Sequence, residues 1–261
     1  MRSPTPAKLI LLAAAITISA CSNPPYIPAP WDSVEPQSEP PTPTLRPAPP
    51  SQRIGSSVRG KAITATTLGS GPKRVYLIGG IHGDEPEAPA AAALLPELLT
   101  TPPAGLTIRL IPDMNPDGTA AKTRTNTRRV DLERNWPARD FIKDERAGDR
   151  PLSELETAAI HADLKAFNPD IIIVLQSANH PPTVAAIGPV LRPAHEFARA
   201  ARSVEPRWRF NPRTPAPIPG SLESLYGRDQ GKTVIRVEFQ RNKDAATNAK
   251  AVAAGLAALT Q

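Results

Sequence analysis

The 261-residue sequence is poor in cysteine and in aromatic residues. Its single cysteine, Cys21, excludes an internal disulfide bond. Aromatic residues make up 4% of the chain, and no basic stripe with interleaved aromatic side chains is present. Nucleic-acid-binding proteins typically carry such a stripe. Because it is missing here, the net charge of +6 does not predict nucleic acid as a partner. An anionic cell wall suits this charge better, although charge alone does not select it.

The N-terminal apolar run, from Leu9 to Ile18, is too short to span a bilayer. It follows Arg2 and Lys8, and the small residues Ser19-Ala20 lead into Cys21. This arrangement resembles the signal sequence and lipobox of bacterial lipoproteins, and it implies cleavage before Cys21 and lipidation of that cysteine. The alternative is an ordinary signal peptide followed by an unrelated cysteine. A lipid anchor would hold the protein in the cell envelope. By analogy, the absence of Asp after the cysteine favours the periplasmic face of the outer membrane in a Gram-negative organism.

Proline dominates the segment that follows. Residues 24 to 50 contain eleven of the chain's 33 prolines, which predicts an extended, polyproline-rich spacer. We therefore divide the chain into a signal peptide (1–20), a proline-rich tether (21–52) and a folded domain (53–261).

The folded domain alternates strand and helix patterns. Helices are predicted at Pro86–Leu99, from the apparent capping box at Ser153 to about Asn168, at Pro193–Ser203, and after Asp244. Residues 112–151 are polar and irregular, and loops of this length are usually functional or disordered. The alternation predicts an α/β three-layer sandwich, with helices on both faces of a mixed, mostly parallel twisted sheet. Its strands are expected at Ala62–Thr67, Arg74–Ile78, Leu106–Ile111, Ile171–Leu175 and Thr233–Phe239.

A short polar motif, His82-Gly83-Asp84-Glu85, follows the strand that ends at Ile78 and the pair Gly79-Gly80. Open α/β sheets bind ligands at the carboxyl edge of their strands. An imidazole and a carboxylate at that edge can bind one divalent metal ion, although a polar loop with an unrelated histidine is the simpler interpretation of the motif by itself.

Further motifs follow in a fixed order. They are Asn115-Pro116-Asp117-Gly118, Arg124-Thr125-Asn126, Val130-Asp131-Leu132-Glu133-Arg134-Asn135-Trp136-Pro137, Pro219-Gly220-Ser221 and Arg236-Val237-Glu238. Their order and spacing resemble the zinc carboxypeptidase superfamily, and most closely its bacterial murein peptide amidases. The resemblance covers nearly all of residues 60 to 260.

The resemblance implies a role for each matching residue. His82 and Glu85 match zinc ligands, and Asp131 matches the carboxylate that orients the ligand histidine. Arg124 matches the arginine that stabilises the oxyanion, Arg134 the one that binds a substrate carboxylate, and Glu238 the general base. Without the family, the arginines would be interpreted as a solvated basic loop, and Glu238 as a partner of Arg236 or Arg241.

Three positions depart from the family pattern. Gln176 occupies the place of the third zinc ligand, a histidine. The amide oxygen of Gln176 could coordinate zinc weakly, His180 could replace it, or the site could lack metal. Glu133 replaces an asparagine that helps to hold the substrate carboxylate, so it would repel that group, pair with Arg134, or bind an ammonium group. Arg129 replaces a glycine, which is costly if the position requires a positive φ.

The first functional hypothesis is a tethered, zinc-dependent peptidase or amidase that cleaves peptidoglycan stem peptides, at the bond between D-glutamate and diaminopimelate. The second is a metal-free binding module for wall peptides or an envelope protein, supported by Gln176 and Glu133. A third is an acyl-amino-acid deacylase, which shares the Gly-Gly-x-His-Gly-x-Glu start. The block from Asn115 to Pro137 argues against it. Because the sequence shows no strong interface pattern, a monomer is expected.

Overall fold

The computed structural model describes residues 49–212 and 216–260. In this part of the chain, eight strands form one sheet in the order β1-β2-β4-β3-β5-β8-β6-β7. The central strands β4, β3, β5 and β8 are parallel, whereas β2 and β6 run antiparallel to their neighbours β4 and β8. The strands are β1 (Ser51–Ser56), β2 (Ala62–Gly69), β3 (Lys73–Ile78), β4 (Leu106–Ile111), β5 (Ile171–Ala178), β6 (Thr183–Ile187), β7 (Arg209–Asn211) and β8 (Thr233–Gln240).

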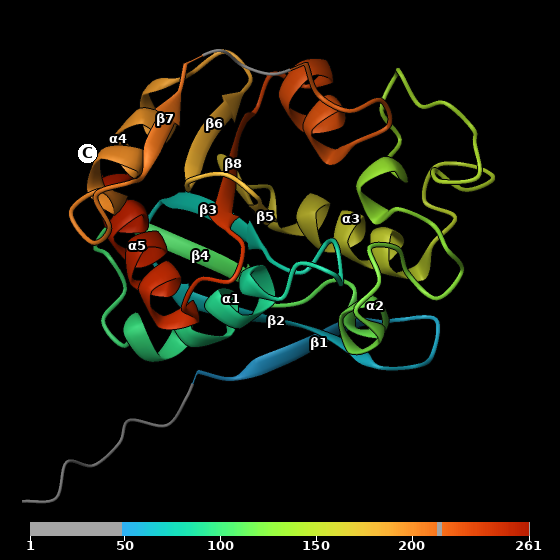
Figure 1. Ribbon diagram of the computed structural model, residues 1–261, viewed down its shortest axis with the longest axis horizontal. Coiled ribbons are helices and arrows are strands. Elements are labelled where there is room, and N and C mark those ends of the chain that lie inside the picture. The colour runs from blue at the N-terminus through green and yellow to red at the C-terminus, as the bar shows by residue number, and fades with distance from the viewer. Residues whose placement is uncertain (1–48, 213–215, 261) are drawn as a thin grey trace, which may run out of the picture. The chain divides into compact units, whose positions relative to one another are not determined.

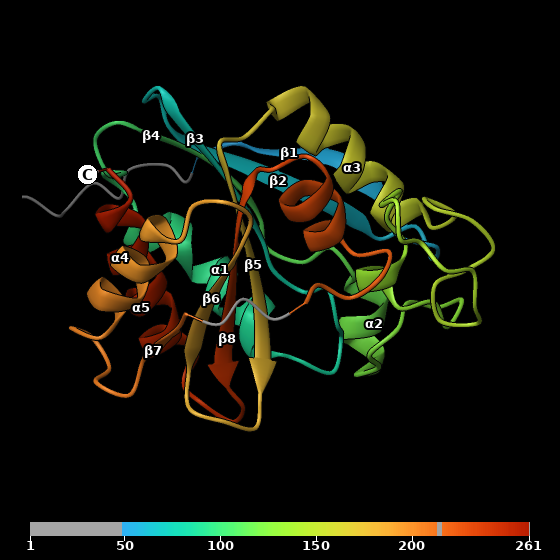
Figure 2. The same ribbon diagram turned by 90° about the horizontal axis from the view of Figure 1, so that it is seen from above.

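Helices cover both faces of this sheet. Helices α1, α4 and α5 pack on one face, and α3 and the π-helix η2 pack on the other (Figures 1 and 2). The predicted three-layer α/β sandwich is therefore confirmed. The helical segments are α1 (Glu87–Leu98), α2 (Pro116–Ala121), the 3-10 helix η1 (Leu132–Arg134), α3 (Leu155–Phe167), α4 (Arg192–Ala201), η2 (Glu223–Asp229) and α5 (Ala245–Ala258).

The apolar runs of the central strands supply both halves of the core. In β3, Val75 and Leu77 belong to the cluster under α1, α4 and α5, whereas Tyr76 and Ile78 belong to the cluster under α3. The residues from Ile171 to Leu175 in β5 alternate between the same two clusters. A strand that is buried on both faces needs no polar positions, which explains why these segments read as continuous hydrophobic runs.

The five predicted strands and four predicted helices are all present, with ends that differ by a few residues. Asp244 caps α5 by accepting a hydrogen bond from the Thr247 N–H. Strands β1, β6 and β7 were missed, and β1 includes Ser51 and Gln52, which the sequence analysis assigned to the tether. The signal peptide, Cys21 and nearly all of the tether lie outside the described residues. Within the described ranges, none of the helices combines the length and apolarity that a membrane span needs.

The predicted capping box of α3 is wrong. The N-cap of this helix is Glu154, and no side chain makes a capping hydrogen bond there. The Glu156 carboxylate, which the capping box would use, is fully buried and accepts hydrogen bonds from the Val58 N–H and the Asn126 side-chain amide instead. A tertiary contact has therefore replaced the local one.

The segment between β4 and α3 is packed rather than irregular throughout. It contains α2 and η1, and its Trp136 side chain is fully buried. Asn126 holds the middle of the segment, because its Oδ1 accepts from two backbone N–H groups and its Nδ2 donates to Glu154 Oε2 at 2.7 Å. The Asp131 N–H donates to the Arg146 carbonyl at 2.7 Å. These bonds fix the position from which η1 reaches the sheet edge.

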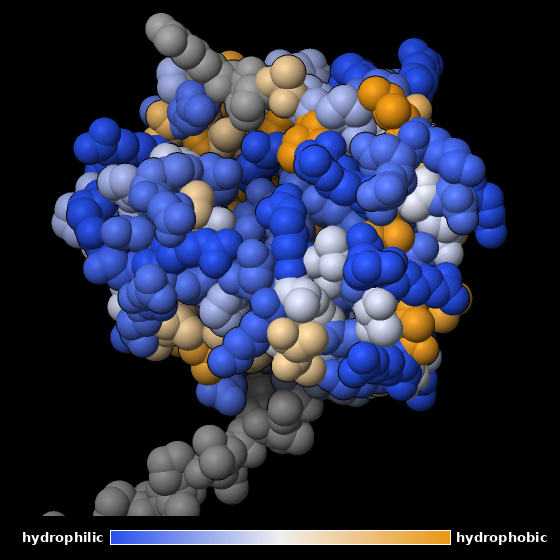
Figure 3. Space-filling view, turned by 45° about the vertical axis from the view of Figure 1, so that its right-hand side comes forward, coloured by the Kyte–Doolittle hydropathy of each residue, from blue (hydrophilic) through white to orange (hydrophobic). Residues whose placement is uncertain are grey.

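The outer surface does not present a broad apolar area on the side that Figure 3 shows. Hydrophilic residues predominate on this face, and apolar residues occur in small groups. Exposed patches that mark interfaces are usually larger. The expected monomeric state remains a prediction.

Gly83 provides the first test of this architecture. A Cβ at this position would lie 1.9 Å from the Gly118 carbonyl carbon in α2, so the turn and α2 approach each other at backbone contact. We expect Gly83→Ala to lower the free energy of unfolding by about 1–3 kcal/mol, because one backbone must move away. Chemical denaturation measures the change. A loss below about 0.5 kcal/mol would contradict the close approach.

Arg129 provides the second test, because its φ is 67° and its side chain is exposed. A non-glycine residue in this region costs on the order of 1 kcal/mol. We expect Arg129→Gly to raise the melting temperature by about 2–4 °C. The adjacent Arg128→Gly is the matched control and should lower it, since Arg128 has no positive φ to relieve. A decrease for both variants would show that the left-handed conformation carries no cost here.

Candidate metal and catalytic site

The candidate residues meet at the carboxyl ends of the central parallel strands. His82 and Glu85 lie in the turn between β3 and α1, Gln176 lies near the end of β5, and Glu238 lies near the end of β8. Gln176 and Glu238 are direct neighbours in the register of β5 and β8. The Ser177 N–H donates to Glu85 Oε2 at 2.7 Å, which ties the turn to β5. The structure thus brings together stretches that are far apart in the sequence.

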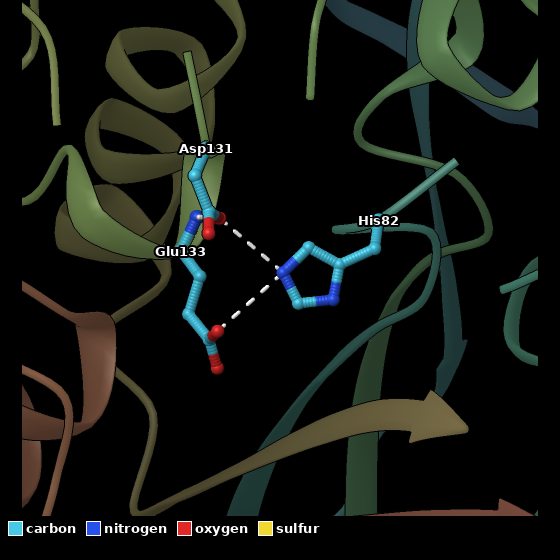
Figure 4. Close-up of side chains that lie close together, drawn as sticks. All are labelled: His82, Asp131 and Glu133. Carbon is cyan, nitrogen blue, oxygen red and sulfur yellow. Dashed lines mark hydrogen bonds and ion pairs between the residues drawn. The ribbon is translucent and has the colours of Figure 1, made fainter. Parts of the chain in front are cut away.

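The imidazole of His82 is buried and faces carboxylates on both sides. Its Nδ1 lies 3.1 Å from Glu85 Oε1. Its Nε2 lies 3.3 Å from Asp131 Oδ1 and 3.4 Å from Glu133 Oε2 (Figure 4). Burial by itself lowers the pKa of His82, but the hydrogen bonds to Asp131, Glu133 and Glu85 outweigh burial and raise that pKa to about 11. Without a metal ion, this ring is an imidazolium.

The short helix η1 supplies both carboxylates on the Nε2 side. Asp131 is the N-cap of η1 and accepts from the Glu133 N–H, which aims both side chains at His82. Burial would raise the pKa of Asp131, but the contacts with His82 and Arg124 lower it to about 2. Burial also acts to raise the pKa of Glu133. The contacts with His82 and the Gln176 amide outweigh burial, so this pKa is lowered. Both groups are carboxylates at neutral pH.

Glu133 is hydrogen-bonded within the protein and is not available to select a substrate by its charge. The Gln176 side-chain N–H donates to Glu133 Oε1 at 2.7 Å, and Arg124 Nη2 donates to Glu133 Oε2 at 3.1 Å. The suggestion that Glu133 pairs with Arg134 therefore does not describe this structure, in which Arg134 Nε lies 3.4 Å from Asp131 Oδ2. Because the Glu133 side chain is buried, its carboxylate is not exposed to a substrate ammonium group.

Arg124 lies where this network of buried charges meets the solvent. Its Nε donates to Asp131 Oδ2 at 3.2 Å, and its side chain remains 44% exposed. The basic-loop interpretation is thus insufficient for Arg124, because the guanidinium pairs with buried carboxylates and is still open to solvent.

Glu238 is held by neighbours other than those suggested by the sequence. The Thr183 hydroxyl donates to Glu238 Oε2 at 2.9 Å, and His180 Nε2 lies 3.5 Å from the same oxygen. Arg236 pairs instead with the buried Glu223, and Arg241 donates to the Asp84 carbonyl. His180 is therefore placed beside Glu238 and not beside His82, so this structure does not support it as a replacement ligand.

The donor atoms around His82 fit a divalent metal ion. Bonds of about 2.0–2.2 Å from zinc to nitrogen and oxygen imply ligand atoms about 3–3.5 Å apart. The distances from Nδ1 to Glu85 and from Nε2 to Asp131 and Glu133 have this size. His82, Asp131 and Glu133 form a cluster whose ligand atoms all lie within 4.8 Å of one another. From the sequence, Glu133 is expected only in contact with substrate or with Arg134. Its presence two residues after Asp131 was the available signal for a metal-binding role.

Comparison with known proteins agrees with the motifs. Residues 51–180 match the family described as zinc carboxypeptidase, and no curated protein sequence matches the chain. Murein-tripeptide amidase MpaA from Escherichia coli O157 shares 19% identity, with a TM-score of 0.64 over 80% of this chain and 90% of that chain. A metallo-carboxypeptidase from Burkholderia cenocepacia shares 21% identity, with a TM-score of 0.65 over 82% of this chain and 64% of that chain. Bovine thrombin-activatable fibrinolysis inhibitor shares 16% identity, with a TM-score of 0.65 over 80% of this chain and 88% of that chain.

At these identities the structural likeness shows a shared fold. The prediction of that fold from the motifs is confirmed, and the match over residues 51–180 agrees with it. The chain contains a zinc carboxypeptidase domain, which is matched over residues 51–180.

Proposed function

We propose that this protein is a zinc-dependent hydrolase of amide bonds in peptides. The observation that carries the proposal is the convergence of a buried histidine, three carboxylates and an exposed arginine at the sheet edge where β8 presents Glu238. His82 is the nitrogen ligand of the ion, and the family pattern adds Glu85 and Gln176. When bound, zinc would supply a Lewis acid and lower the pKa of a water molecule.

Glu238 is the proposed general base. It lies at the end of a central strand, where the backbone is rigid, and the Thr183 hydroxyl fixes one carboxylate oxygen at 2.9 Å. Its side chain is 26% exposed, so a substrate amide and a water molecule can approach it. A carboxylate in this position can accept a proton from the attacking water and pass it to the leaving amine.

The arginines bind and stabilise the substrate. Arg124 is exposed and held in place by Asp131 and Glu133, so its guanidinium can donate to the oxygen of a scissile amide as negative charge develops there. Arg134 lies 3.4 Å from the same Asp131, with 25% of its side chain exposed, and can bind a substrate carboxylate.

We propose peptidoglycan stem peptides as the substrates, with cleavage between D-glutamate and diaminopimelate. The support is the motif resemblance to murein peptide amidases and the structural likeness to a murein-tripeptide amidase. Lipidation of Cys21 and a proline-rich tether would place the domain near the cell wall, at the outer membrane in a Gram-negative organism. These two steps rest on the sequence alone.

A second candidate function is peptide binding without catalysis. It is favoured by the replacement of the third histidine ligand by Gln176, and by the charge balance around His82. The imidazolium, Arg124 and Arg134 are three positive groups that already pair with the carboxylates of Glu85, Asp131 and Glu133. Such a network is satisfied without an added cation.

One experiment distinguishes these functions. The purified protein is analysed for zinc and incubated with murein tripeptide, next to Glu238→Gln and to the surface control Glu196→Gln, whose carboxylate pairs with Arg199 on α4. We expect Glu238→Gln to reduce turnover by about 10²–10⁴-fold without loss of zinc, since only the proton acceptor is removed. The control should retain full turnover.

Two other outcomes would contradict the hydrolase. Full turnover in Glu238→Gln would exclude Glu238 as the base. Tripeptide binding without zinc and without cleavage would favour the binding function.

A further inference from the structure

We infer that the metal ion in this protein binds on the Nε2 side of His82, with Asp131 and Glu133 as its carboxylate ligands. The inference rests on the proposed metal dependence but changes the ligand set. The family pattern would place the ion with Glu85 and residue 176, whereas the donors in this chain gather on the opposite side of the ring.

The imidazole separates two groups of donors. Nδ1 faces Glu85 Oε1 at 3.1 Å. Nε2 faces Asp131 Oδ1 at 3.3 Å and Glu133 Oε2 at 3.4 Å (Figure 4). One ion can use only one of the two ring nitrogens. A site needs at least three protein ligands to resemble known catalytic zinc sites, and the Nε2 side offers an imidazole with two carboxylates.

Two of the three departures from the family pattern, Gln176 and Glu133, are in contact with each other. The Gln176 amide donates to Glu133 Oε1 at 2.7 Å, and this bond leaves Glu133 Oε2 facing His82. Gln176 is then a positioning residue rather than a ligand. Gln176 replaces a histidine ligand on the Nδ1 side, and Glu133 adds a carboxylate on the Nε2 side. Because the two side chains bond to each other, we treat the two replacements as one change of ligand set.

The Nδ1 side is less suited to a cation. Glu85 Oε2 already accepts from the Ser177 N–H, and Glu85 Oε1 has guanidinium nitrogens of Arg124 and Arg241 at 3.8 Å. Arg241 is anchored there by its bond to the Asp84 carbonyl at 2.7 Å. A metal ion beside Nδ1 would meet two guanidinium groups and one carboxylate. On the Nε2 side, the guanidinium groups of Arg124 and Arg134 are set against two carboxylates, at 3.1–3.4 Å.

The carboxylates on the Nε2 side can bind an ion and keep their other partners. Asp131 directs Oδ2 to Arg124 and Arg134, and its Oδ1 faces the ring while it accepts from the Glu133 N–H. Glu133 Oε2 accepts from Arg124 at 3.1 Å, and a carboxylate oxygen has a second lone pair for a metal. Ligating carboxylates are commonly hydrogen-bonded in this way.

Glu85 then takes the orienting role that the family pattern gives to Asp131. With an ion on Nε2, the remaining ring proton sits on Nδ1 and donates to Glu85 Oε1 across the observed 3.1 Å. A hydrogen bond of this kind fixes the tautomer and the ring orientation of a metal-binding histidine. Glu85 is then the orienting carboxylate and Asp131 a metal ligand, which is the reverse of their roles in the family pattern.

The test compares Glu133→Gln with the matched variant Glu85→Gln in the intact protein. Zinc affinity is measured by chelator competition. Loss of an orienting group typically costs 10–100-fold in affinity, so loss of the Glu133 ligand should cost at least about 100-fold. Glu85→Gln should cost less than about tenfold, because the new amide oxygen can still accept from Nδ1. The reverse order would overturn the inference.

A direct readout uses the unaltered protein and does not depend on the folding of any variant. Nitrogen NMR of the His82 ring, assigned against His82→Gln among the four histidines of the chain, should show a zinc-bound Nε2 and a protonated Nδ1. A zinc-bound Nδ1 would overturn the inference, whatever the affinities.

A designed reversal separates this inference from the proposed function. Gln176→His combined with Glu133→Asn rebuilds the family pattern, and its zinc binding should become sensitive to Glu85→Gln by at least about 100-fold. Zinc held through Glu133 without any hydrolysis would contradict the hydrolase and leave the ligand set intact. Hydrolysis with zinc held through Glu85 would contradict only the ligand set. A protein that binds no zinc would contradict both.

Discussion

The contact of one buried imidazole with carboxylates on both of its nitrogen atoms organises the sheet edge. His82 touches Glu85 within its own turn and Asp131 and Glu133 on η1, a helix that lies about fifty residues further along the chain. A buried charge is stable only where opposite charges and hydrogen bonds surround it. The requirement to satisfy His82 therefore holds η1 against the β3–α1 turn. Glu85 extends the same network to β5 through the Ser177 N–H.

This contact also explains why the long segment before α3 is ordered. Asp131 can reach His82 only if the chain on either side of it is fixed. Asn126 holds the incoming chain by four hydrogen bonds to buried or backbone groups, and the buried Trp136 holds the outgoing chain. The positive φ of Arg129 lies between them. The strained turn persists because the contacts on both sides determine its shape.

The sequence was sufficient for the fold and for the location of the site, because both depend on local patterns. The run at Ile171–Leu175 predicts a central strand, and a polar motif after such a strand predicts the ligand-binding edge. The edge strand β7 has only three residues, too few for a periodic pattern. The contact between Gln176 and Glu133 could not be predicted either. It joins a strand to a short helix, and it depends on how far each side chain reaches once both elements have docked.

The identity of the ligands determines which ions the site can select. A set with one imidazole and two carboxylates is a harder donor set than the family pattern of two imidazoles and one carboxylate. It also brings one more negative charge to the ion, which offsets the nearby guanidinium groups of Arg124 and Arg134. The discrimination between zinc and harder ions such as manganese is then smaller than in a site with two histidines. In the ligand set that we infer, Gln176 and Glu133 would thus preserve a cation site and change which cations compete for it.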